Sequence, residues 1–225
     1  MLKHLRALIP AHVSGRAVLR FFEVLRRWHR LWHRHGGANL LRNRAALAAH
    51  LPDLHLHGGY VEDQHQWCDT AYGRFTMSYS GCEVFAFYNA LVSVGMADAA
   101  LLPELIEAFE RDGMVLRGRF GTSPRALITH LKRYGLGAEL STRVQEFESI
   151  ARRSASLILT LYNDGCDICK QVHTVCITKE ADGYLVHNLG GNGTADGPYP
   201  GITQLLAEIN GGRAKAICLL GITKQ

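Results

Sequence analysis

The spacing of apolar and polar residues changes once along the chain. Between residues 80 and 152, apolar side chains recur every three or four positions, which is typical of helices with one buried face. After residue 155, short apolar runs are separated by turns rich in glycine, asparagine and aspartate, which is typical of strands. Helices followed by strands predict an α+β fold with a mostly antiparallel sheet.

Capping and helix-breaking residues set the expected ends of these elements. Ser80, followed three residues later by Glu83, matches a capping box, so a helix is expected to start there and to end at Gly95. The glycine-rich stretch 190–201 is expected to be a loop. Further helices are expected over residues 101–111, 124–134, 144–152 and 202–209, and strands over residues 138–141, 154–163, 170–180, 183–191 and 214–224.

Residues 1–57 form a predicted helical extension in front of a domain that covers residues 58–225. One helix is expected to end at Gly36, and a second is expected from Leu40 to His50, before Pro52. The first 44 residues hold ten Lys or Arg residues and one acidic residue, a net charge of +9 in a chain whose total is +5, so the remainder carries −4. The apolar stripe of the first helix comprises Val18, Leu19, Phe22, Leu25, Trp28 and Trp32.

This basic extension has three interpretations. The simplest is that its apolar stripe packs on the domain. The alternatives are a docking or inhibitory segment, and a surface that meets an acidic partner or an anionic membrane. The chain contains no zinc-finger spacing or other nucleic-acid motif, so no nucleic-acid partner is expected.

Composition bounds the cellular setting. No apolar run approaches the ~20 residues of a membrane span, and basic residues interrupt the apolar positions near the N-terminus, so no signal-peptide core is visible. Six cysteines in 225 residues are too few for a disulfide scaffold. We therefore expect a cytoplasmic protein whose cysteines are free thiols, metal ligands or a nucleophile.

Cys82 is the first candidate for chemistry. The stretch SGCEVFAFYNALVSVG places it in the first turn of a predicted helix. Unpaired N–H groups and the positive end of the helix dipole stabilise a thiolate there, whereas an ordinary cysteine is mostly protonated at neutral pH. A buried structural cysteine is the competing interpretation.

His173 and Asn188 lie on two strands that a predicted hairpin places side by side. Strand alternation puts Asn188 on one face with Tyr184 and Val186. The side-chain amide of an asparagine beside a histidine can accept one ring N–H, which fixes the tautomer and leaves the other nitrogen for a thiol. Cys82, His173 and Asn188 therefore predict a Cys-His-Asn site.

Three stretches resemble the papain-like cysteine peptidases, most closely the stand-alone relatives of the bacterial double-glycine leader peptidases, which process bacteriocins. They are SGCEVFAFYNALVSVG, FGTSPRALITHLKRYGL and HTVCITKEADGYLVHNLGG, and the resemblance covers about residues 66–225. It implies a helical lobe facing an antiparallel sheet, and a hydrolase without a cofactor that acts on a peptide or protein substrate. It also implies the roles of nucleophile for Cys82, base for His173 and orienting residue for Asn188. A preference for Gly-Gly is implied by the resemblance alone.

The chain departs from that family's pattern around the nucleophile. The family usually has a glutamine several residues before the cysteine, whose amide helps to bind the oxyanion, but the residue six positions before Cys82 is Thr76. Gln66, Thr76 and Ser78 are the candidates for that donor; otherwise the site is weak or inactive. Glu83 stands where relatives often have glycine, and its carboxylate opposes ionisation of the thiol unless a capping bond holds it away.

A second constellation overlaps the same histidine. Cys166, Cys169, His173 and Cys176 are metal-ligand types at short spacing. Strand alternation sends His173 and Cys176 to opposite faces, which disfavours a zinc site with all four ligands. Cys166 and Cys169 alone can hold a metal, form a redox pair or stay free thiols.

The sequence thus leaves three functional hypotheses. The leading one is a cysteine peptidase or a related amide hydrolase or transferase that uses Cys82, His173 and Asn188. The second is a papain-like binding or regulatory protein with weak or no catalysis. The third is a metal- or redox-responsive protein that uses Cys166 and Cys169.

Overall fold

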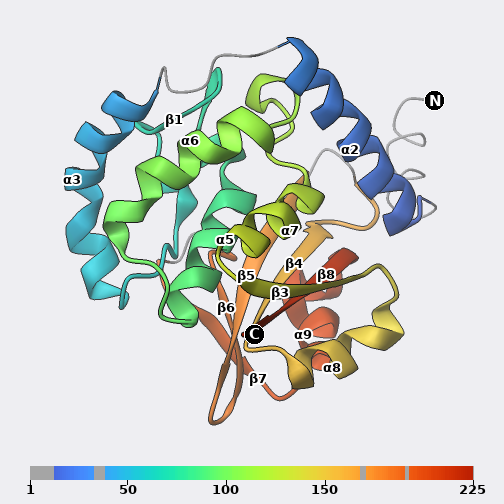
Figure 1. Ribbon diagram of the computed structural model, residues 1–225. Helices are drawn as coiled ribbons and strands as arrows, with labels where there is room; N and C mark the ends of the chain where they lie inside the picture. The colour runs from blue at the N-terminus through green and yellow to red at the C-terminus, as the bar shows by residue number, and fades with distance from the viewer. Residues whose placement is uncertain (1–12, 33–38, 168–170, 191–192, 225) are drawn as a thin grey trace.

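The computed structural model describes residues 13–32, 39–167, 171–190 and 193–224, and these residues form an α+β fold (Figure 1). A six-stranded sheet runs in the order β3-β8-β4-β5-β6-β7, and every pairing in it is antiparallel, so the predicted class and sheet type are confirmed. Its strands are β3 (Leu136–Ser141), β4 (Ser156–Tyr162), β5 (Val172–Glu180), β6 (Gly183–His187), β7 (Asp196–Tyr199) and β8 (Lys215–Lys224).

Helices cover both faces of this sheet, which explains why the central strand β4 is buried along its whole length. On one face lie α3 (Leu40–Leu56), α5 (Cys82–Ser93), α6 (Leu102–Asp112) and α7 (Pro124–Arg133), and on the other lie α8 (Val144–Arg153) and α9 (Ile202–Glu208) (Figure 1). Shorter elements join them: η1 (Gln64–Gln66), β1 (Ala71–Tyr72), β2 (Phe75–Thr76), α4 (Met77–Ser80), η2 (Ala99–Leu101), η3 (Leu116–Gly118) and η5 (Ile209–Gly212).

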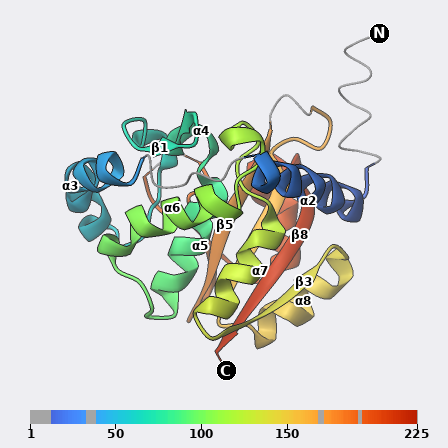
Figure 2. The same ribbon diagram turned by 45° about the horizontal axis from the view of Figure 1, so that its top comes forward.

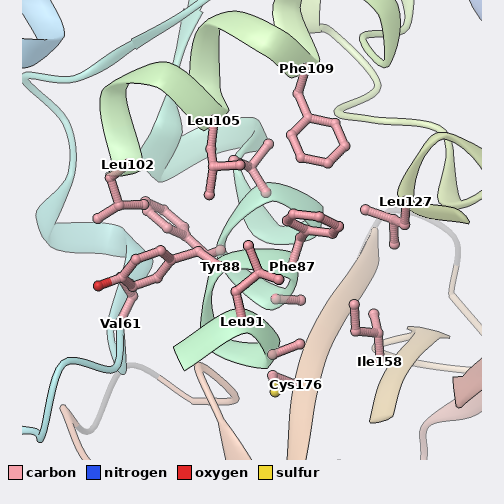
Figure 3. Close-up of a cluster of buried hydrophobic side chains, with 14 of the residues drawn as sticks. Val61, Phe87, Tyr88, Leu91, Leu102, Leu105, Phe109, Leu127, Ile158 and Cys176 are labelled. Carbon is pink, nitrogen blue, oxygen red and sulfur yellow. The ribbon is translucent and has the colours of Figure 1, made fainter. Parts of the chain in front are cut away.

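Helix α5 is the centre of the larger core. All of its side chains from Cys82 to Leu91 are buried. Figure 3 shows Phe87 directed toward Phe109 of α6, while Cys176 of β5 lies below α5 near Leu91. A helix packed on all sides can be apolar all round, because none of its faces is exposed to water. Close packing also holds its first residue, Cys82, in a rigid position.

The N-terminal helix α2 (Gly15–Trp32) packs against strand β8 of the sheet (Figure 2). Val18, Leu19 and Phe22 are buried there with Tyr162 and Ile217. Leu25 is partly buried against the same cluster, whereas Trp28 is 62% exposed. Helix α2 therefore packs on the domain through its stripe as far as Leu25.

Two expectations about element boundaries were wrong. Helix α3 does not stop before Pro52 but continues to Leu56, where Leu54 packs into the core. Pro52 has no N–H to donate to the carbonyl of Ala48, four residues earlier. The helix tolerates this loss because Ala48 is exposed to water, which can bind the free carbonyl. The expected glycine-rich loop contains strand β7, which pairs with β6 through Tyr199 and Tyr184. Across the described ranges, no helix has the length and apolar character needed to cross a membrane.

Candidate active site

Cys82, His173 and Asn188, the three residues predicted to act together, line one cavity of about 330 Å³. The nucleophile candidate comes from the first residue of α5, the histidine from the start of β5, and the asparagine from the residue after β6. Gln64 and Ser78, from η1 and α4, line the same cavity. The tertiary structure therefore joins segments from four parts of the chain at this point.

The predicted capping box at the start of α5 is absent. Ser80 belongs to α4, and its hydroxyl donates to the Thr76 carbonyl at 3.4 Å. Gly81 is the N-cap of α5 and provides no side-chain bond. A Cβ at Gly81 would lie 2.6 Å from the Met77 carbonyl oxygen, so only glycine fits where α4 meets α5. This tight junction, rather than a cap, presents Cys82 at the helix start.

The Glu83 carboxylate lies against the thiol instead of capping the helix. Cys82 Sγ donates to Glu83 Oε2 at 3.2 Å, and the same oxygen accepts the Thr122 N–H at 3.4 Å. Burial raises the pKa of Cys82 well above its usual value, and the charge of Glu83 is the next largest cause. The backbone N–H groups of Thr174 and Glu83 lower the pKa by less. Burial also raises the pKa of Glu83 to about 7. The thiol is therefore protonated in this arrangement.

His173 is held as a neutral base. Its Nε2 lies 2.6 Å from the backbone carbonyl oxygen of Asn188. A carbonyl oxygen only accepts, so Nε2 carries the proton and Nδ1 is left as an acceptor. Burial lowers the pKa of His173 against the bond to Asn188, which raises it, so the imidazole is uncharged at neutral pH.

Asn188 supports His173 in a different way from the one expected. Its side-chain Oδ1 accepts the Gln64 N–H at 2.9 Å, and its Nδ2 donates to Gln64 Oε1 at 3.0 Å. The backbone carbonyl, not the amide, orients the histidine. Strand β6 ends at His187, and Asn188 has a left-handed φ of 63°, so strand alternation no longer applies to it.

A buried polar network that the sequence did not suggest lies behind Asn188. Glu62 Oε1 lies 2.7 Å from His187 Nδ1, and Glu62 Oε2 accepts the Asn188 N–H at 3.2 Å. The Thr178 hydroxyl lies 2.8 Å from His187 Nε2. Tyr60 stacks on His187 with ring centroids 4.1 Å apart. Glu62 therefore fixes the main chain that in turn fixes His173.

The three predicted oxyanion donors, Gln66, Thr76 and Ser78, and the unpredicted Gln64 differ in position. Gln64 is buried in the cavity wall, where its Nε2 donates to the Ser78 carbonyl at 3.0 Å. Ser78 also lines the cavity, but its hydroxyl donates to the His65 carbonyl at 3.1 Å. Gln66 is exposed, and Gln66 and Thr76 both lie outside the cavity.

The geometry of η1 explains why Gln64 rather than Gln66 faces the site. A 3₁₀ turn has about three residues per turn, so residues two apart point in different directions. The next residue, Trp67, is buried and stacks on His50 with centroids 3.9 Å apart. Trp67 is one 3₁₀ turn after Gln64. Its apolar side chain is the sequence signal that could have predicted that Gln64, and not Gln66, faces inward.

The two described cysteines of the competing constellation differ in their surroundings. Cys176 is fully buried beneath α5, with its Sγ 3.6 Å from the Ser156 hydroxyl. Cys166 is exposed, and Cys169 lies outside the described residues. No group of three or more His, Cys, Asp or Glu side chains suited to a metal ion occurs in the part of the chain that the structure describes. A metal or redox role for the Cys166 and Cys169 pair stays a prediction.

Comparison of the chain with protein-family models, curated proteins and solved structures finds no match. The resemblance to papain-like peptidases therefore stays a prediction from the quoted stretches.

Proposed function

We propose that the protein is a papain-like thiol hydrolase that acts on a peptide or amide bond in the cytoplasm. One observation carries the proposal. A neutral histidine, with its tautomer set by a main-chain carbonyl and its Nδ1 left as an acceptor, shares a cavity with a cysteine at the start of a buried helix. Such a pair is the minimum needed to generate a thiolate beside its own proton acceptor.

The first chemical step starts when the thiol leaves Glu83 and turns to His173. Nδ1 accepts the proton from Sγ, and the thiolate attacks the substrate carbonyl carbon, so that a C–S bond forms and one electron pair moves to the oxygen. The Cys82 N–H has no earlier carbonyl of its own helix to bind, and it can donate to that oxyanion. The buried amide of Gln64 is the second donor, in place of the glutamine expected closer to the nucleophile.

The second step returns the proton. His173 donates it to the leaving nitrogen, the C–N bond breaks, and a thioester on Cys82 remains. Water, deprotonated by the same Nδ1, then hydrolyses the thioester and restores the thiol. A second amine in place of water would make the reaction a transfer, which uses the same three residues.

The test is the alkylation of Cys82 by iodoacetamide across a range of pH, measured by mass spectrometry. Cys68 is exposed and provides an internal reference in the same molecule. His173→Ala is expected to slow alkylation of Cys82 at neutral pH by roughly tenfold or more relative to Cys68. His55→Ala, which removes an exposed histidine outside the cavity, is the matched control and is expected to have little effect.

The contact between Cys82 and Glu83 favours a second candidate function. A protonated thiol bound to a carboxylate suits a papain-like binding or regulatory protein that has lost efficient catalysis. Identical Cys82 alkylation profiles in the wild type, His173→Ala and His55→Ala would support this candidate and refute the hydrolase.

A further inference from the structure

A second cavity, larger than the first, also ends at Cys82. Its volume is about 590 Å³, and it shares Tyr79, Cys82, Gln171 and Val172 with the polar cavity that holds His173. The two cavities therefore meet at the thiol. A substrate whose carbonyl lies at Sγ would extend from it into both.

The walls of this second cavity are mainly hydrocarbon and aromatic surface. Helix α2 provides one wall, with Ala17, Val18, Phe21 and Phe22. The rest of the apolar lining comes from Val13, Tyr79, Phe120, Tyr162 and Val172. Cavities of about 300–1,000 Å³ with apolar walls and few polar groups are typical of small-molecule sites.

Only two charged side chains line the cavity among the residues described. Arg119 is exposed to solvent, and the Glu83 carboxyl lies at the thiol. Neither side chain could pair with a charged group of a ligand that lay between the apolar walls. An uncharged, apolar group is the chemistry that such walls stabilise, because it leaves no polar atom without a hydrogen bond.

The wall made by α2 belongs to the N-terminal extension. Residues 15–32 lie in front of the part of the sequence that resembles papain-like peptidases. Val18 and Phe22 are buried against Tyr162, which anchors the helix in place. The extension therefore builds a boundary of the candidate site as well as covering the domain.

We propose that the cavity beside α2, the α2 cavity, binds an apolar acyl-side group of the substrate, with the attached carbonyl at Cys82. The proposal rests on the proposed thiol chemistry and defines its substrate class. Two sources have the required chemistry: the alkyl chain of an N-acyl amide and a large apolar side chain in a peptide. Each methylene that enters the cavity is expected to strengthen binding about fourfold.

The first test is equilibrium binding to the full-length Cys82→Ser variant, which cannot react as a thiol. The ligands are N-methyl alkanamides of increasing chain length, and N-acetyl amino-acid N-methyl amides of glycine, leucine and tryptophan, measured by ligand-observed NMR. Affinity is expected to rise with apolar size in one series or the other, which identifies the source. Affinity that is independent of apolar size in both series would overturn the proposal.

Two substitutions on α2 form a matched pair. Phe21 lines the cavity and is 54% exposed, whereas Val24, one turn further on, is 55% exposed and lies outside the cavity. Both positions tolerate a charge without burying it, so both variants are expected to fold. Phe21→Asp is expected to weaken binding of the longest ligand about tenfold, and Val24→Asp to leave it unchanged. Equal effects of the two substitutions would overturn the proposal.

The second test places the carbonyl at the thiol. In the wild type, p-nitrophenyl alkanoates acylate Cys82: a C–S bond forms, the C–O bond to p-nitrophenolate breaks, and the thiol proton passes to His173. The rate at Cys82, located by mass spectrometry, is expected to rise about fourfold per methylene, while the rate at exposed Cys68 stays constant.

The two tests separate the α2 cavity from the thiol chemistry. Suppose that binding depends on ligand size but Cys82 is inert both in the wild type and in His173→Ala. That result would refute the hydrolase and leave the α2 cavity as an apolar-ligand site. A Cys82 that reacts through His173, with acylation and binding both independent of chain length, would refute the α2 cavity and leave the hydrolase in place.

Discussion

Two glutamates at the candidate site are equally buried but have very different partners. Glu62 and Glu83 are each 3% exposed. Glu62 uses both oxygens, one toward the His187 ring at 2.7 Å and one toward the Asn188 N–H at 3.2 Å. At Glu83, Oε2 meets a thiol at 3.2 Å and a backbone N–H at 3.4 Å.

The difference shows that partners decide what a buried carboxyl does. An imidazole N–H and a backbone N–H, one on each oxygen, make Glu62 a structural support for the loop that carries Asn188. A thiol is a weak donor, so burial dominates at Glu83 and raises its pKa to about 7. One glutamate therefore stabilises the site, and the other can change its charge near neutral pH.

Removal of Glu62 is expected to have the largest effect. Glu62→Ala leaves the N–H groups of His187 and Asn188 buried without acceptors, and the expected loss is about 4 kcal/mol in the free energy of unfolding. Urea denaturation provides the measurement. Glu180→Ala is the control, because Glu180 is exposed at the end of β5 and its loss is expected to cost less than about 0.5 kcal/mol. Equal losses in the two variants would remove Glu62 from its supporting role.

The pH dependence of stability is expected to reveal Glu83. Its pKa is raised in the folded state from 4.5 to about 7, so between these values the folded protein keeps a proton that the unfolded chain releases. Wild-type stability is therefore expected to fall by on the order of 3 kcal/mol as the pH rises through that window. Urea denaturation of Glu83→Gln, which has no proton to release, should lack this fall. A fall of the same size in the variant would assign the effect to another group.

The smallest expected effect concerns the reactivity of Cys82. Glu83→Gln removes the neighbouring charge that raises the pKa of the thiol, so alkylation by iodoacetamide at mildly alkaline pH should speed up by about tenfold. Mass spectrometry of the labelled peptide, normalised to Cys68, measures the change. A slower reaction in this variant would mean that Glu83 assists the thiol instead of restraining it.

The fold could be predicted largely from local patterns. The spacing of apolar residues predicted a helix over residues 144–152, and the structure has α8 at Val144–Arg153. The hairpin of β5 and β6 follows the predicted turn, with Glu180 paired to Gly183. These predictions succeeded because a helix or strand with one buried face repeats its apolar residues at a spacing that a few neighbouring positions reveal.

The candidate site could be predicted only in its outline. The sequence placed Cys82 at a helix start and His173 near Asn188, and all three line one cavity. It assigned the wrong atoms to the contacts, because the Asn188 carbonyl and not its amide meets His173. Gln64 acquired its contacts with Asn188 from tertiary packing, which no local pattern describes, whereas the contact of Glu83 with the thiol joins adjacent residues.

Local sequence patterns were enough to specify the α+β class, most helices and strands, and the position of Cys82 at the start of α5. The tertiary structure decided which polar groups meet there and that α2 forms a wall of the second cavity. The physical reason is distance along the chain. Buried polar groups must find partners wherever folding brings them, and Gln64 binds Asn188 across 124 positions. Periodicity acts over a single helix or strand, so it specifies the elements and leaves their meeting points to packing.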